Sequence, residues 1–113
     1  MTRFATDVGA WKAHSDVPVY SPASRGKLML TLDPSKRARV SSLHAEWSGE
    51  DGLSVTAAPA HEDPDSGVWT STAEFEIARE VQEDELLARA TVTYRVEGIE
   101  KTITLGAVVP VAR

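Results

Sequence analysis

Hydrophobic and polar residues alternate with a period of two along most of the chain, which is typical of β-strands buried on one face. Four segments share this alternation and lie at residues 27–32, 42–47, 53–57 and 69–77. The last is the longest: Trp69, Phe75 and Ile77 face one way, and threonines and glutamates face the other. Threonine and aromatic residues are enriched in strands. We therefore expect these segments to be strands that share one core.

Residues 86–109 predict a β-hairpin. Glu97-Gly98 fits a two-residue turn, because glycine adopts a positive φ without steric cost. If Val96 pairs with Ile99, then Arg95 lies opposite Glu100 on the outer face. The same register pairs Ala90 with Leu105, Val92 with Ile103 and Tyr94 with Lys101 inside, and Thr91 with Thr104 and Thr93 with Thr102 outside. A slip by one residue would expose the apolar side chains, so the pattern specifies this register.

The segments between these strands are rich in Asp, Pro, Ser and Gly, which are turn residues. The one helical candidate is Arg79–Ala90, where we expect a loop between sheets. Six or seven strands without a convincing helix predict an all-β protein, an antiparallel immunoglobulin-like β-sandwich. We expect residues 17–113 to form this single domain. Residues 1–16 are weakly periodic and predict a partly ordered segment, with Trp11 against the body.

The composition excludes several classes of protein. The chain has 113 residues and no cysteine, so it has no disulfide framework, thiol nucleophile or thiolate zinc site. It has no apolar run of membrane-helix length and no signal-peptide core, so we expect no membrane insertion. The compartment stays open: cytoplasmic as the sequence is written, or exported if a longer precursor is trimmed.

Part of the chain resembles a bacterial protein family. The motifs are Gly67-Val68-Trp69-Thr70, Glu74-Phe75-Glu76-Ile77 and Ala90-Thr91-Val92-Thr93-Tyr94. Residues 53–109 are thereby similar to the last strands of the N-terminal domain of transmembrane thiol:disulfide reductases. That family carries a redox-active cysteine pair just after the last of these strands, where this chain reads Arg95-Val96-Glu97-Gly98-Ile99. The resemblance implies an immunoglobulin-like scaffold without the redox chemistry.

Basic residues gather in the first third of the chain. Residues 1–39 hold seven basic and three acidic residues, whereas the remainder holds five basic and fourteen acidic ones. The densest basic cluster is Lys36, Arg37 and Arg39. No aromatic residue lies close to it in sequence to stack on bases, so we expect no nucleic-acid binding. The cluster is a candidate for docking an acidic protein partner.

The C-terminal segment Ala107–Val111 is apolar on both faces, which suggests burial on both sides by the N-terminal segment or by a partner strand. Val108 and Val109 are therefore candidate partner-binding residues. The other candidate edge, Val17–Tyr20, contains Pro18 and is followed by Pro22, and these prolines guard it. These features favour a non-catalytic protein-binding or structural module that acts through a sheet edge or loop surface, or that associates with itself.

Two other functions stay open. His14, His44, His61 and Met29 are possible ligands of a copper or zinc site, although neither HxH nor HExxH occurs. Trp47 and Trp69 are possible sugar platforms, but their phase places them with core residues. The chain lacks GxSxG, Ser-x-x-Lys and glycine-rich phosphate motifs. We therefore expect no enzyme activity and no cofactor.

Overall fold

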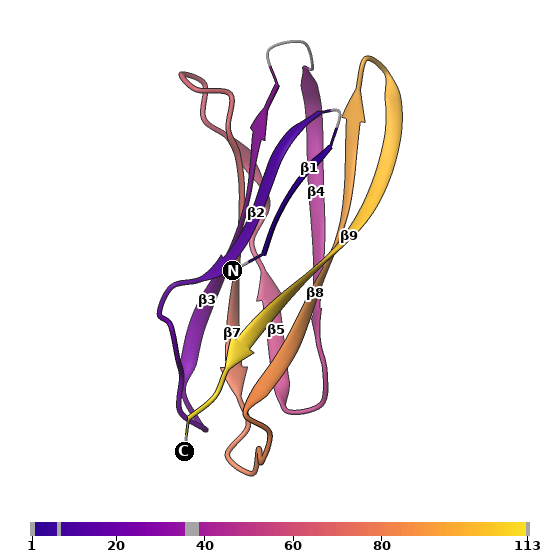
Figure 1. The fold of residues 1–113 in the computed structure, drawn as a ribbon. Helices are drawn as coiled ribbons and strands as arrows, with labels where there is room; N and C mark the ends of the chain where they lie inside the picture. The colour runs from indigo at the N-terminus through magenta and orange to yellow at the C-terminus, as the bar shows by residue number, and fades with distance from the viewer. Residues whose placement is uncertain (1, 7, 36–38, 113) are drawn as a thin grey trace.

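The computed structural model describes residues 2–6, 8–35 and 39–112, which form two antiparallel sheets packed face to face (Figure 1). The strands are β1 (Thr2–Thr6), β2 (Gly9–Ser15), β3 (Arg25–Pro34), β4 (Val40–Gly49), β5 (Leu53–Ala57), β6 (His61–Glu62), β7 (Trp69–Ile77), β8 (Glu85–Val96) and β9 (Ile99–Pro110). These residues contain no helix, so none could cross a membrane as a helix. The predicted antiparallel β-sandwich is confirmed.

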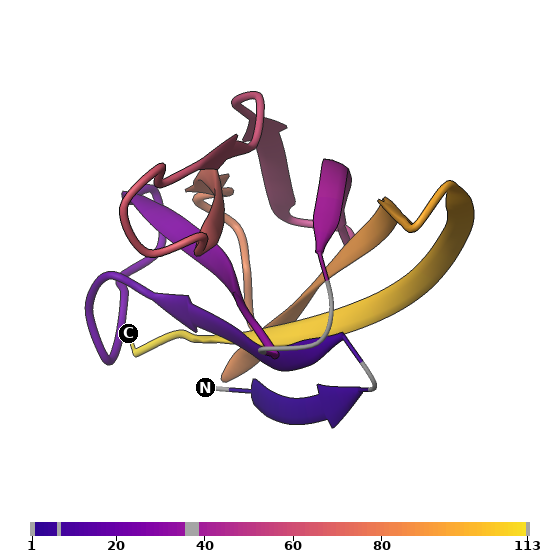
Figure 2. The same ribbon diagram turned by 90° about the horizontal axis from the view of Figure 1, so that it is seen from above.

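One sheet has the order β1-β2-β3-β7-β5, with β6 also on β7, and the other has the order β4-β8-β9. Without β1 and β6, this is the arrangement of an immunoglobulin constant-type domain, in which strands A-B-E-D face C-F-G. Figure 2 shows β1 at the margin of its sheet, beside β2. The described residues thus form nine strands, more than the six or seven expected, because β1, β2 and β6 lie in segments without a clear alternation.

Residues 1–16, expected to be a partly ordered segment with Trp11 against the body, contribute two strands to one sheet, β1 and β2. β1 and β2 form a hairpin, and β2 pairs with β3 so that Trp11 lies opposite Leu32. Trp11 is 1% exposed, and its ring centroid lies 5.4 Å from that of Tyr94 in the facing sheet. Its Nε1 donates a hydrogen bond to Thr6 Oγ1 at 2.9 Å. Burial of one large side chain thus anchors a segment whose own pattern is weak.

Residues 16–20 cross from the edge of one sheet to the other. Tyr20 N donates to Pro110 O at 3.0 Å, and Ala112 N donates to Tyr20 O at 2.8 Å, in a parallel bridge beside the end of β9. The Tyr20 ring packs edge-on against Phe75, with 4.8 Å between centroids. Gly26 lies beneath it, where an added Cβ would come within 2.3 Å of the Tyr20 ring. The crossing segment therefore ties the two sheets together.

The hairpin β8–β9 has the register that the sequence predicts. Val96 pairs with Ile99, and all the inner and outer pairs follow. Arg95 Nη2 lies 3.5 Å from Glu100 Oε2. The turn residues Glu97 and Gly98 have φ values of 52° and 79°. Positive φ at both central positions defines a type I′ turn, whose twist matches that of the strands.

This turn gives a first prediction. Gly98→Ala places a Cβ in open space but at a positive φ, and we expect a loss of about 1 kcal/mol in the free energy of unfolding. Glu97→Asn is the matched variant, because asparagine tolerates this conformation better than glutamate, and it is expected to stabilise. Urea denaturation measures both. Equal stability of the two variants would show that the turn conformation does not limit stability.

Candidate functional site

The outer face of β9 carries an exposed apolar residue near its end. Ala107 and Val109 are 3% and 0% exposed and face the core, whereas Val108 is 43% exposed. The expectation that Val109 contacts a partner is therefore wrong. Alternation continues to the end of β9 although both faces are apolar, so Val109 fills the core and Val108 alone faces outward.

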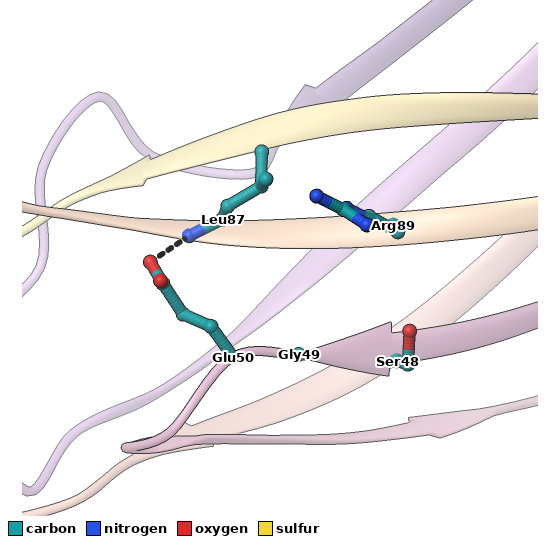
Figure 3. A pocket seen from close by; sticks show the side chains of 5 residues that line it. All are labelled: Ser48, Gly49, Glu50, Leu87 and Arg89. Carbon is teal, nitrogen blue, oxygen red and sulfur yellow. Dashed lines mark hydrogen bonds between the residues drawn. The ribbon is translucent and has the colours of Figure 1, made fainter.

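Two hollows flank Val108. One, of about 320 Å³, lies over β8 and the end of β4 (Figure 3), and the other, of about 540 Å³, lies between β9 and residues 14–18. Leu87 lines the first hollow and is the cross-strand partner of Val108, so this hollow lies next to Val108. We call the combined area the Val108 surface. It comprises Val17, Pro18, Leu87, Arg89, Val108 and Pro110.

The first hollow has a fixed floor. Glu50 N donates to Leu87 O at 3.1 Å, and Leu87 N donates to Glu50 Oε1 at 2.6 Å (Figure 3). The Glu50 side chain thus takes the place of a main-chain acceptor and continues the β4–β8 ladder beyond Gly49. This bond engages the carboxylate with the main chain and holds Leu87 at the rim.

Arg89 supplies the positive charge of the surface. It is exposed, and its side chain lies beside Leu87 (Figure 3). Among the described residues it has no ion-pair partner within 4.0 Å. Gly106 lies opposite it on β9, so no side chain covers the guanidinium from that position. A carboxylate ligand would have access to a bidentate donor here.

The second hollow depends on a fixed crossing segment. Asp16 accepts hydrogen bonds from the Tyr20 hydroxyl and from Lys27 N, the latter at 3.0 Å. The bond from Tyr20 is the main reason that the pKa of Asp16 lies below its ordinary value. Burial, followed by this same bond, raises the pKa of Tyr20. The segment leaves Val17 exposed beside Val108, at 42%.

The basic cluster and the C-terminal valines do not form one site. Lys36 and Arg37 lie outside the described residues, and Arg39 is exposed just before β4. Val40 pairs with Val96, at the opposite end of β8 from Leu87 and Val108. At roughly 3.3 Å per residue, about 30 Å of strand separates Arg39 from the Val108 surface.

The proposed metal ligands are mostly dispersed. His14 and Met29 are cross-strand partners on β2 and β3, and His14 Nδ1 is buried without a hydrogen-bond partner. His44 lies on β4, 3.6 Å from Glu46, and His61 lies on the short β6. The described residues hold no group of three His, Cys, Asp or Glu that could bind a metal ion.

The two candidate sugar-binding tryptophans pack against the core, as their phase predicted. Both Trp47 and Trp69 are half-buried. Trp47 Nε1 donates to Ser71 Oγ, the one buried polar side chain among the described residues, at 3.3 Å. Their rings therefore do not form an exposed platform on one face of a sheet.

Comparison with known proteins supports the fold. No protein-family model and no curated protein matches the chain. The GAE domain of GGA2p from Saccharomyces cerevisiae is similar at 13% identity and a TM-score of 0.67, covering 97% of this chain and 98% of that one. The GAE domain of yeast GGA1 is similar at 10% identity and a TM-score of 0.69, covering 96% of this chain and 99% of that one. A collagen-binding domain from a Staphylococcus aureus adhesin is similar at 9% identity and a TM-score of 0.50, covering 88% of this chain and 96% of that one.

The Asp16 bonds predict a pH dependence of stability. Asp16→Asn removes a charged acceptor, and we expect a loss of about 1 kcal/mol at neutral pH. Because the folded pKa of Asp16 is lowered, its contribution is present above the ordinary carboxyl range and is lost as pH falls through the folded pKa. The difference between wild type and variant should thus be constant from neutral pH to about pH 5 and shrink below about pH 4.

Thermal unfolding across this pH range measures the difference. Tyr20→Phe is the matched variant, because it removes the donor and leaves the ring on Phe75. It should show a similar pH profile. A difference that persists unchanged in acid would contradict the role of the ionised Asp16.

Proposed function

We propose that this protein is a non-catalytic protein-binding module that binds an extended segment of a partner protein on the Val108 surface. The bound segment carries apolar side chains for Val108 and Val17 and a carboxylate for Arg89. The observation that carries the proposal is the exposed Val108 between two hollows, with an arginine that has no ion-pair partner among the described residues.

The chemistry of the surface supports a protein ligand. Contiguous exposed apolar patches rimmed by polar residues mark interaction sites on monomers, and Val17, Val108 and Pro110 adjoin one another here. Arginine is enriched at protein interfaces, where its planar fork pairs with carboxylates. The ordered floor made by Glu50 and Leu87 reduces the entropy lost on binding. The Staphylococcus aureus neighbour, a collagen-binding domain, offers an example of a binding function on a similar β-sandwich.

The arrangement of polar groups supports a role without catalysis. The pKa of Asp63 is lowered mainly by a hydrogen bond from Asp65 N within a surface loop. The pKa of Asp16 is lowered mainly by the bond from Tyr20, and the pKa of Tyr20 is raised mainly by burial and then by the same bond, which has a structural role. Active sites instead tend to gather perturbed groups in a cleft.

Selection from a random peptide library displayed on phage tests the proposal. Enriched peptides should combine apolar residues with Asp or Glu. Val108→Asp should weaken their binding at least about tenfold, or about 1.4 kcal/mol, in fluorescence polarisation. Arg89→Glu should weaken acidic peptides and spare versions with the carboxylate replaced by an amide.

Ile99→Asp is the matched control. Ile99 is also an exposed apolar residue of β9, 60% exposed, but it lies at the hairpin turn, away from Val108. It should leave peptide binding unchanged. Failure to enrich any peptide, or equal loss in the Val108 and Ile99 variants, would refute the proposed site.

A further inference from the structure

β4 has one free edge. It pairs with β8 on one side, and no described strand pairs with its other side. Proteins usually protect such edges with lysine, proline or short strands. β4 is ten residues long and contains neither lysine nor proline. β1 and β5 have five residues each, and β9 carries an inner-face Lys101 and ends at Pro110. Apart from a bulge between Val40 and Ser42, β4 is thus the longest edge strand in the described part of the chain that lacks these protections.

The register with β8 shows which main-chain groups point to this edge. Glu50 N bonds to Leu87 O, so position 50 faces β8. Pairing is regular from Ser42 to Gly49, and successive residues of an antiparallel strand direct their main-chain groups to opposite sides. Positions 42, 44, 46 and 48 therefore bond to β8. Leu43, Ala45 and Trp47 direct their N–H and C=O groups to the free edge.

The sequence of β4 is complementary to itself when run antiparallel about Ala45. In that register His44 lies opposite the partner's Glu46, and Glu46 lies opposite the partner's His44. Ser42 then faces the partner's Ser48, and Leu43 faces the partner's Trp47. His44 and Glu46 have side chains 70% and 77% exposed, so both are accessible to a second copy.

Other symmetric registers are less favourable. The main-chain groups that face the edge belong to Leu43, Ala45 and Trp47. A symmetric antiparallel pair that bonds at least two of these residues must be centred at position 44, 45 or 46. Centring at 44 places His44 opposite the partner's His44, and centring at 46 places Glu46 opposite the partner's Glu46. Two glutamates directly opposite each other repel, which disfavours centring at 46, and centring at 44 pairs the two histidines and leaves Glu46 opposite the partner's Ser42. Of the three registers, only the one centred on Ala45 places each His44 opposite a Glu46, so side-chain complementarity selects it.

We propose that two copies of this chain associate through their β4 edges, antiparallel and centred on Ala45. The pairs at positions 43, 45 and 47 would form about six main-chain hydrogen bonds. The contact is isologous and closes with two subunits. It also covers Trp47, which is half-buried in one copy. This goes beyond the proposed function, because Val108 lies two strands away on β9.

Sedimentation velocity over a concentration series tests the dimer. Wild type should pass from monomer to dimer as concentration rises. His44→Glu places a glutamate opposite the partner's Glu46 at both symmetric positions, and it should raise the dissociation constant of the dimer at least tenfold. The double variant His44→Glu/Glu46→His restores opposite pairs in the same register and should recover the dimer. A wild type that stays monomeric into the millimolar range, or a dimer insensitive to His44→Glu, overturns the proposal.

The substituted side chains are exposed, and near-UV circular dichroism checks that each variant is folded. Thr102→Glu is the matched control, because it adds a charge to the same outer face but on β9. It should leave the dimer unchanged. Val108→Asp should also leave it unchanged, which separates this contact from peptide binding.

Cysteine pairing resolves the register, because the chain contains no cysteine of its own. Ser42→Cys/Ser48→Cys should form a covalent dimer under mild oxidation, since non-hydrogen-bonded partners have Cα atoms about 4.5 Å apart. His44→Cys and Glu46→Cys report the other two registers, and Thr104→Cys gives the background rate. Faster cross-linking of any of these three single variants than of the double variant overturns the Ala45 register.

Discussion

The type I′ turn at Glu97-Gly98 fixes the register of β8 and β9, and most of the molecule depends on that register. Twelve residue pairs follow from it. It places Ala88, Ala90 and Val92 in the core, where each is fully buried. It also decides that Val109 packs inside while Val108 faces outward. Because β4 pairs with β8, the same register also sets which main-chain groups of β8 are left to bond β4.

The sandwich pairs sheets of unequal size. In the smaller sheet, β4-β8-β9, the two edge strands are the long strands β4 and β9. Residues 16–20 cover only the end of the β9 margin, through Tyr20, and leave Val17 exposed beside Val108. No described strand pairs with the β4 margin, although the start of β5 lies against Gly49 at its end. The proposed peptide site thus lies on the outer face over β8 and β9, and the proposed dimer contact lies at the β4 margin of the same sheet; the two meet at Ser48, and the dimer contact leaves Val108 uncovered.

The local part of the structure could be predicted from the sequence. The β8–β9 pairs depend on neighbouring residues and on one turn, so alternation and charge were enough. The inward position of Val109 could also be predicted, because Val109 alternates in phase with Leu105 and Ala107, which face the core. The hairpin of β1 and β2 could not be predicted, since its anchor is the contact of Trp11 with Tyr94, which joins distant segments. For the same reason no local pattern places Val17 beside Val108. The resemblance to thiol:disulfide reductases stays a prediction.

The Tyr20–Val111 bridge has a consequence for the order of folding. It joins residues separated by almost the whole chain, whereas the β8–β9 turn closes a loop of two residues. Loop-closure entropy rises with the length of the loop, and non-local contacts slow folding. We expect the hairpin to form early and the bridge to close late. A truncated or stalled folding intermediate would then expose Tyr20, Phe75 and the apolar end of β9 together.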